Sequence, residues 1–107
     1  MPMRTERLDL PGPWDPLYAG HFPGRPLIPG ALLLDAALRA IGAGRGLVLT
    51  QWELAQVKFL APTAPGAALH VAHQWRGDGA LSFLVRSAEG EVARGLLRRA
   101  APPPDAP

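Results

Sequence analysis

Alternating apolar and polar residues in the second half of the chain predict a series of short β-strands. One run alternates Leu69, Val71, His73 and Trp75 with other residues, and the next alternates Leu81, Phe83 and Val85. Gly77-Asp78-Gly79 between these runs is typical of a hairpin turn, and His73 is expected to pack because it is in register with the apolar residues. Glu89-Gly90 marks the next turn, and the residues upstream of the runs are mostly extended. The strands that we expect are residues 3–10, 47–60, 69–75, 81–85 and 91–99.

One strong helix is expected from Ala31 to about Gly42, because Ala and Leu dominate this stretch. Pro29-Gly30 ends the loop before it, and the glycine-rich stretch that begins at Gly42 is expected to end the helix. Apolar residues cover almost its whole circumference, apart from Asp35 and Arg39, which predicts a helix buried on most sides. One long helix followed by an antiparallel meander indicates an α+β fold, in which a curved sheet wraps around the helix.

The length of 107 residues suits a single domain. We expect that domain to span residues 1–100, and the proline-rich tail of residues 101–107 to be disordered. Residues 17–30 are rich in Gly and Pro yet apolar, which predicts a shaped, partly buried loop rather than a flexible linker. A chain of this length buries a core with little area to spare, so we expect at least a dimer.

The composition gives little support for a bound metal ion or a cofactor. The chain has no cysteine, which excludes a disulfide framework and a thiolate metal site. Its histidines, His21, His70 and His73, are not spaced as a ligand cluster, because His70 and His73 would point to opposite faces of a strand. We therefore expect neither a metal ion nor a cofactor.

The charge pattern argues against binding to nucleic acid or membrane. The net charge is only +2, and only Arg94, Arg98 and Arg99 gather, at what we interpret as a solvated strand end. No apolar stretch is long enough to span a bilayer, and we see no leader sequence, so a cytoplasmic protein is expected. The mild basic bias would still favour an acidic protein partner.

Candidate chemistry lies between residues 20 and 35. His21 stands on the Gly- and Pro-rich loop, and histidine can accept a proton near neutral pH. Pro29-Gly30 opens the helix, whose free N–H groups suit a carbonyl oxygen that gains negative charge. Asp35 follows on the helix, and a carboxyl group shielded from water can stay protonated and act as an acid. A base, an acid and an oxyanion donor are what elimination of water from a 3-hydroxyacyl thioester requires.

The stretch GHFPGRPLIPGALLLDAAL, which carries these residues, resembles the FabA/FabZ-type 3-hydroxyacyl-(acyl carrier protein) dehydratases of the hotdog superfamily. The spacing from His21 to Asp35 equals the family's spacing from catalytic histidine to catalytic acid. A second match runs from Val57 through Pro62 to Pro65-Gly66, so the resemblance covers roughly residues 18–70. The short segment before the histidine and the choice of Asp resemble the ApeI-like proteins of aryl-polyene-type pathways, an N-terminally short branch of the hotdog fold.

The resemblance implies a role for each matching residue. His21 would remove the proton next to the thioester carbonyl, and Asp35 would protonate the departing hydroxyl group. The Gly30 amide would donate to the thioester oxygen, and the Leu27 carbonyl would orient the His21 ring. The histidine and the acid would come from different subunits, with the acyl chain in a tunnel between them. The residues expected to contact the substrate are Phe22, Pro29 and Phe59.

Several alternatives remain open at the level of sequence. The thioester could be carried by acyl carrier protein or by coenzyme A. The assembly could be a homodimer, a larger homo-oligomer, or a hetero-oligomer with another hotdog protein. A hotdog thioesterase would use the helix carboxylate to activate water, and a non-catalytic subunit would only bind acyl chains or a partner. The His21 loop favours dehydration in fatty-acid or polyene-type biosynthesis.

Arg39 affects whether Asp35 can act as an acid. It stands four residues after Asp35, where the FabZ-type sequences usually carry Gln, and residues at this spacing commonly form surface ion pairs. An ion-paired carboxylate is a poor proton donor. We expect Arg39 to point to solvent or to another partner, which would leave Asp35 free to act.

Overall fold

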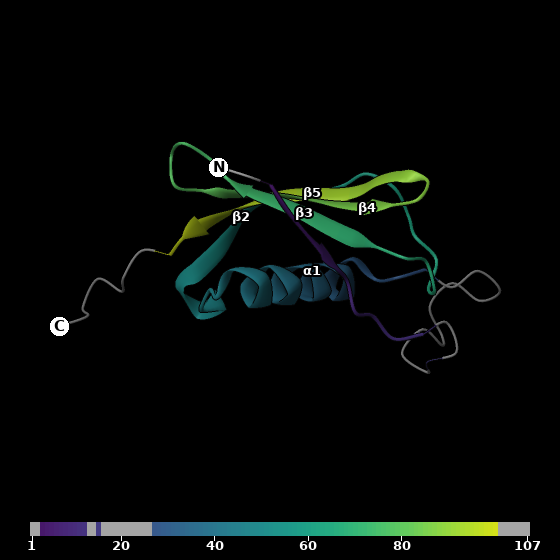
Figure 1. The fold of residues 1–107 in the computed structure, drawn as a ribbon. Coiled ribbons are helices and arrows are strands. Elements are labelled where there is room, and N and C mark those ends of the chain that lie inside the picture. Colours follow the sequence, from purple (N-terminus) through teal and green to yellow (C-terminus); the bar gives the residue numbers. More distant parts are fainter. Residues whose placement is uncertain (1–2, 13–14, 16–26, 101–107) are drawn as a thin grey trace.

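The protein folds into two layers, a helix and an antiparallel sheet that covers one side of it (Figure 1). The computed structural model describes residues 3–12, 15 and 27–100. The expected tail of residues 101–107 and most of the 17–30 loop, including His21 and Phe22, lie outside the described residues. The described elements are β1 (Arg4–Arg7), α1 (Gly30–Arg45), the short 3-10 helix η2 (Leu49–Gln51), β2 (Trp52–Phe59), β3 (His70–Trp75), β4 (Leu81–Ser87) and β5 (Gly90–Arg99).

The sheet has the order β1-β3-β4-β5-β2, and every neighbouring pair is antiparallel. Strands β3, β4 and β5 form the predicted meander, and β1 and β2 are added at its two edges. Helix α1 connects these edge strands across one face of the sheet. The expected α+β hotdog architecture is therefore confirmed.

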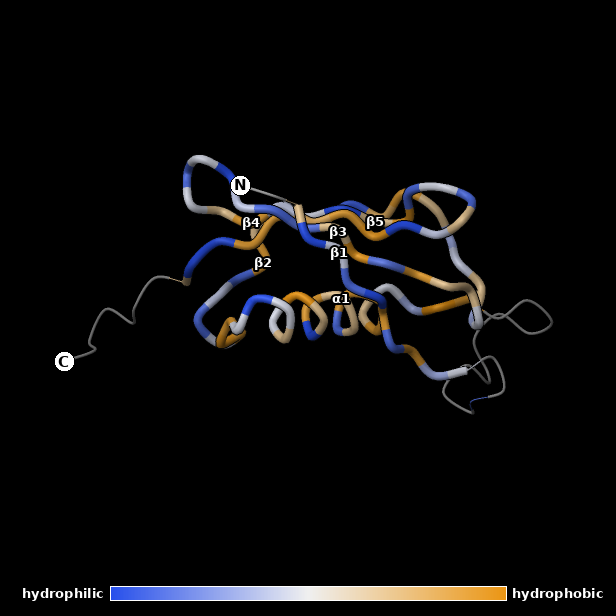
Figure 2. Tube along the Cα trace, in the orientation of Figure 1, coloured by the Kyte–Doolittle hydropathy of each residue, from blue (hydrophilic) through white to orange (hydrophobic). Residues whose placement is uncertain are grey.

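The core forms where alternate strand residues meet one side of α1. Val71 lies opposite Val85 in the β3–β4 ladder, and both are fully buried. Ala37 and Ile41 reach the same core from the helix. Because successive side chains of a strand point to opposite faces, apolar and polar residues alternate along these strands (Figure 2). Burying such aliphatic side chains contributes roughly 1.5–3 kcal/mol each, which makes this layer contact the main source of stability.

The helix differs from its prediction in where it ends. It continues to Arg45, and Gly46 ends it in a left-handed conformation with φ of 67°. Gly42 and Gly44 lie within the helix, where they let other side chains approach closely. A Cβ at Gly42 would lie 3.2 Å from the Leu49 side chain, and one at Gly44 would collide with the Glu6 carboxylate. These two glycines therefore serve packing against η2 and β1, and they do not terminate the helix.

In the single chain α1 leaves one row of residues exposed, which includes the two expected exceptions, Asp35 and Arg39. Leu33, Ala37 and Ile41 face the sheet and are buried. The opposite face carries an exposed row, spaced by four residues, which we call the outward row: Ala31, Asp35, Arg39 and Ala43. Three leucines of the helix are only half-buried: Leu32, Leu34 and Leu38.

Two predicted strands are shorter than expected. The first covers only Arg4–Arg7 of residues 3–10. In the 47–60 segment, η2 occupies Leu49–Gln51 and the strand starts at Trp52. Every residue of β2 after Trp52 is exposed, because β2 is an edge strand at the far side of the sheet from β1.

Gly95 in β5 allows a close approach that a larger residue would block. A Cβ there would lie 2.5 Å from Cζ of Phe83 and 2.6 Å from the Gln56 carbonyl oxygen. We expect Gly95→Ala to lower the free energy of unfolding by about 1–3 kcal/mol through overpacking. Urea denaturation measures the change. Gly77→Ala is the control, since nothing lies within 4 Å of its Cβ position, and an equal loss in both variants would contradict the packing argument.

A buried histidine ties the end of α1 to the sheet. His73 is 1% exposed. Arg45 donates from Nε to His73 Nδ1 at 2.7 Å and from Nη2 to the His73 carbonyl at 3.0 Å. The Glu6 carboxylate lies 3.6 Å from His73 Nε2, and Arg4 donates to the Gly44 carbonyl nearby. Because Nδ1 accepts a bond from a cation, the neutral imidazole is the form that fits this site.

Protonation of His73 should therefore weaken the fold. Burial, and then the Arg45 charge, lower the pKa of His73 below its ordinary value of 6.5. The unfolded chain thus binds the proton more readily than the folded chain. The contribution to stability is complete above about pH 6.5 and is lost progressively as the pH falls below it.

We expect the melting temperature to fall between about pH 7.5 and pH 5 more steeply in the wild type than in His73→Gln. Thermal melts at several pH values measure both slopes. His70→Gln, at an exposed position of the same strand, should keep the wild-type slope. If the slope flattens in His70→Gln but not in His73→Gln, the effect comes from His70 and the account of His73 is wrong.

Candidate functional site

The first turn of α1 presents free backbone donors. Pro29 precedes the helix in an extended conformation with ψ of 141°, and no side chain caps the helix. The Leu33 N–H donates to the Pro29 carbonyl at 3.0 Å, so the amides of residues 30–32 precede the first bond of the helical ladder. Together with the positive end of the helix dipole, these amides can stabilise an oxygen that gains negative charge.

An apolar hollow of about 490 Å³ adjoins this helix start. Phe59 at the end of β2 forms one wall, and its ring lies so close to Gly30 that a Cβ there would be 2.8 Å from Cζ. A side chain at position 30 would therefore force the Phe59 ring to move. The hollow adjoins backbone N–H groups that the helical ladder does not use, and an apolar wall beside such donors suits an acyl thioester.

The segment that leads into α1 is pinned to the chain after β2. The Ile28 N–H donates to the Thr63 carbonyl at 2.9 Å, and the Leu60 N–H donates to the Val92 carbonyl at 2.8 Å. Leu27 and Pro29 are half-buried on either side of Ile28. The helix start is thus bonded to the segment after β2, and that segment is bonded in turn to β5. The proposed contact of the Leu27 carbonyl with the His21 ring lies partly outside the described residues and stays a prediction.

Asp35 lies in a different setting from the one predicted. Its Oδ2 is 3.0 Å from Nε of Arg39, so the expectation that Arg39 turns away is wrong for the single chain. The side chains of Asp35 and Arg39 are 53% and 76% exposed. The four-residue spacing brings the two side chains together, and no element among the described residues covers this face of α1.

One chain does not bring the acid to the hollow. Asp35 belongs to the outward row of α1, whereas the hollow lies on the side of the helix that faces β2. The described residues thus supply the oxyanion donors and the apolar wall at one place and the carboxylate at another.

Comparisons with known proteins identify the family. The family model described as ApeI-like, ApeI dehydratase, matches residues 10–96, which is most of the chain and includes every candidate residue. This chain belongs to the ApeI-like dehydratase family.

Curated relatives of this ApeI-like protein are dehydratases by name. A 3-hydroxyacyl-[acyl-carrier-protein] dehydratase FabZ of Chlamydia trachomatis is 36% identical over 103 residues, which cover 79% of this chain and 67% of the relative. A FabZ of Haemophilus influenzae is 34% identical over 90 residues, covering 74% of this chain and 61% of the relative. The chain spans about two thirds of the length of these relatives.

Solved structures confirm the fold. The dehydratase heterocomplex ApeI:P from Xenorhabdus doucetiae matches with a TM-score of 0.69 at 24% identity, over 92% of this chain and 88% of that chain. The fluoroacetyl-CoA thioesterase FlK matches with a TM-score of 0.61 at 21% identity, over 92% of this chain and 84% of that chain. At these identities the two likenesses show that the hotdog fold is shared.

Sequence reasoning missed part of the hollow in this ApeI-like protein. Leu33, Thr63 and Val92 line it together with Gly30 and Phe59. Leu33 could have been found, because it lies three residues after Gly30 and so shares its side of the helix. Thr63 lies within the second family match, whereas Val92 carries no local signal, since a backbone bond from Leu60 brings it to the site.

The described residues hold no cluster of three or more His, Asp and Glu that could bind a metal ion. No helix in the described part of the chain has the length and apolar character needed to cross a membrane.

Proposed function

We propose that this protein eliminates water from 3-hydroxyacyl thioesters carried on acyl carrier protein, which yields the trans-2-enoyl thioester. Membership of the ApeI-like dehydratase family and the similarity to FabZ proteins support this reaction. The observation that carries the proposal is the uncapped helix start at Gly30 beside the hollow walled by Phe59. It offers backbone donors to the thioester oxygen and an apolar surface to the acyl chain.

The proposed chemistry needs one base and one acid. His21 takes a proton from C2 of the acyl chain while the Gly30 amide stabilises the charge on the thioester oxygen. The C3–O bond then breaks, Asp35 gives a proton to the leaving hydroxyl group, and water departs as the C2–C3 double bond forms. The proton held by His21 restores Asp35 through solvent or the departing water, so the enzyme is unchanged after each turnover.

The ion pair with Arg39 is weak enough to open. Both side chains are more than half exposed, and pairs of this kind contribute about 0–1 kcal/mol. We expect Arg39→Gln to retain the kcat of the wild type within about threefold, because Arg39 only accompanies Asp35 on the surface. Steady-state kinetics with the carrier-bound substrate measures this. A loss as large as that caused by Asp35→Asn would show that the pair itself is required.

The proposal includes a homodimer that covers the outward row and the open edge of β2. The outer edge of β2 has no neighbouring strand in the described chain. Four exposed apolar side chains lie along β2 or directly after it: Leu54, Val57, Phe59 and Leu60. Such an unpaired apolar edge favours pairing with another strand. Light scattering at micromolar concentration should show a dimer or a larger assembly. A stable monomer would contradict the shared site, and a requirement for a second hotdog protein would favour the hetero-oligomer.

The reaction itself is tested by mass spectrometry of the intact carrier protein. With a 3-hydroxyacyl carrier as substrate, we expect a product lighter by one water, still attached to the carrier. Release of free acid with an unmodified carrier would indicate a thioesterase. No change of the substrate at any chain length would indicate a non-catalytic subunit.

A further inference from the structure

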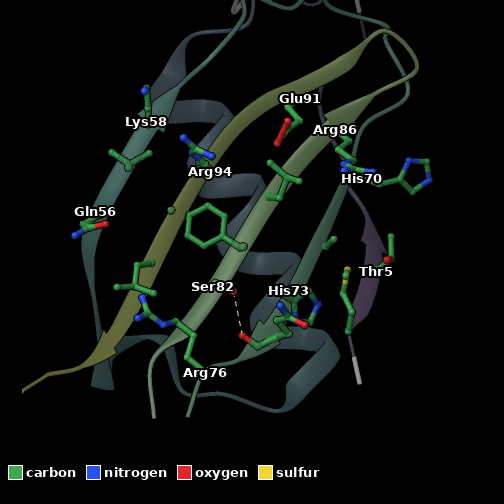
Figure 3. Close-up of a pocket in the computed structure, with 18 residues that line it drawn as sticks. Thr5, Gln56, Lys58, His70, His73, Arg76, Ser82, Arg86, Glu91 and Arg94 are labelled. Carbon is green, nitrogen blue, oxygen red and sulfur yellow. Dashed lines mark hydrogen bonds between the residues drawn. The ribbon is translucent and has the colours of Figure 1, made fainter. Parts of the chain in front are cut away.

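The hollow at Gly30 differs in character from a second hollow on the opposite face of the sheet. That second hollow, of about 920 Å³, is lined by many polar and charged side chains, among them Lys58, Ser82 and Arg94 (Figure 3). The hollow at Gly30 has an almost wholly apolar lining. Among the described residues that line it, Thr63 alone has a polar side chain. In an otherwise apolar site, a few polar groups commonly fix the orientation of the ligand.

A backbone contact holds Thr63 next to the helix start. Its carbonyl accepts the bond from the Ile28 N–H at 2.9 Å, and Ile28 stands two residues before Gly30. Two residues span at most about 7 Å, so Thr63 lies close to a thioester whose oxygen is bound at Gly30. The Thr63 hydroxyl group forms no hydrogen bond within the described residues. When a substrate displaces water from the hollow, this hydroxyl group needs a partner on the substrate, because an unpaired polar group is destabilising there.

The hollow at Gly30 has a buried side and an open side. Leu33 and Val92 on the buried side are only 3% and 2% exposed. On the open side Pro62 is exposed and Thr63 is half-buried. An acyl chain is apolar, so it is stabilised on the buried side. The carrier stays in solvent, so the pantetheine arm that links it to the thioester has to leave by the open side, past Thr63.

The polar groups of the substrate leave one match for the Thr63 hydroxyl group. In the proposed reaction the Gly30 amide binds the thioester oxygen, and Asp35 acts on the 3-hydroxyl group. The acyl chain beyond C3 offers no hydrogen-bonding group. The pantetheine arm carries an amide two methylene groups after the sulfur, and this amide is the same in acyl carrier protein and in coenzyme A. A threonine hydroxyl group can donate to the carbonyl of this amide or accept from its N–H.

We propose that Thr63 is a specificity-determining residue, whose hydroxyl group hydrogen-bonds the first amide of the pantetheine arm. This inference rests on the proposed function, and it adds the residue that distinguishes thioesters with this arm from simple thioesters. The amide is remote from the bonds that form and break, so the hydrogen bond is equally strong in the bound substrate and in the transition state. It therefore lowers KM and leaves kcat unaffected.

The experiment compares one 3-hydroxyacyl group on two small thiols. The N-acetylcysteamine thioester contains the amide, whereas the S-pentyl thioester has carbon atoms in its place. Thr63→Val replaces the hydroxyl group by a methyl group, and it should raise KM for the N-acetylcysteamine thioester about three- to tenfold with little change in kcat. Its effect on the S-pentyl thioester should be smaller, because that substrate has no group for the hydroxyl to bind. Thr63→Ser keeps the hydroxyl group and should keep the preference of the wild type.

Thr50→Val is the matched control, because it makes the same change at an exposed position in η2, outside the hollow. It should keep the wild-type KM for both thioesters. An equal loss for both thioesters in Thr63→Val would overturn the proposal, because the side chain would then only shape the hollow, and an unchanged KM for both would overturn it as well. Either result leaves the dehydratase intact.

If the wild type dehydrates neither thioester, the proposed function fails, and the role of Thr63 is then tested by binding alone. Calorimetric titration with the N-acetylcysteamine thioester should show weaker binding to Thr63→Val than to the wild type. Equal affinity for the two proteins, or binding to neither, would overturn the proposed hydrogen bond.

Discussion

Replacing His21 by alanine should lower kcat for dehydration by about a hundredfold or more, because loss of a general base typically costs this much. His21 is the only histidine near Gly30 in the sequence. Neither alanine nor a water molecule in its place would remove the C2 proton as fast as the imidazole. The measurement is steady-state formation of the enoyl thioester, monitored by its absorbance. The melting temperature should remain close to that of the wild type.

His70→Ala is the control for this variant, because His70 is exposed, whereas its neighbour Val71 is buried on the side of the sheet that α1 covers. It should keep kcat. Turnover of His21→Ala at the wild-type rate would show that another group is the base. A large drop in melting temperature would instead make the residue structural.

Replacing Asp35 by asparagine should have a comparable effect, about a hundredfold on kcat. The amide keeps the size of the side chain but has no acidic proton to give to the leaving hydroxyl group. Asp35→Glu should recover part of the activity, because it restores an acid one methylene further from the helix. If Asp35 only paired with Arg39 at the surface, Asp35→Asn would keep its activity, because an exposed position tolerates the amide. Wild-type kcat in Asp35→Asn would remove the residue from the mechanism.

The fold could be predicted from the sequence because the signals for its strands, turns and helix are local. The alternation of Leu81, Phe83 and Val85 and the turn at Gly77-Asp78-Gly79 predicted the meander, and the structure confirms it. The helix end was misplaced, because glycines in a sequence signal both termination and close packing. Only the contacts of Gly42 with Leu49 and of Gly44 with Glu6 distinguish the two.

The candidate site was only partly predictable, for a different reason. Gly30 and Phe59 were both expected there, and the structure brings them into contact. The position of Asp35 was not foreseen, because an apolar helix predicts burial without saying what buries each side. In the single chain the sheet covers one side, and the outward row stays exposed. The pattern of apolar and polar residues in one chain does not say which surface of a partner covers this row.

The central claim is that this protein is a dehydratase whose site joins His21 of one chain to Asp35 of another. The most direct test mixes His21→Ala with Asp35→Asn under conditions that exchange subunits, followed by native mass spectrometry. Half of the dimers in a random mixture combine the two variants, and each combined dimer has one of its two sites intact. The account therefore predicts recovery of about a quarter of the wild-type dehydration rate. A mixture that forms combined dimers yet stays at the rate of the separate variants would contradict it.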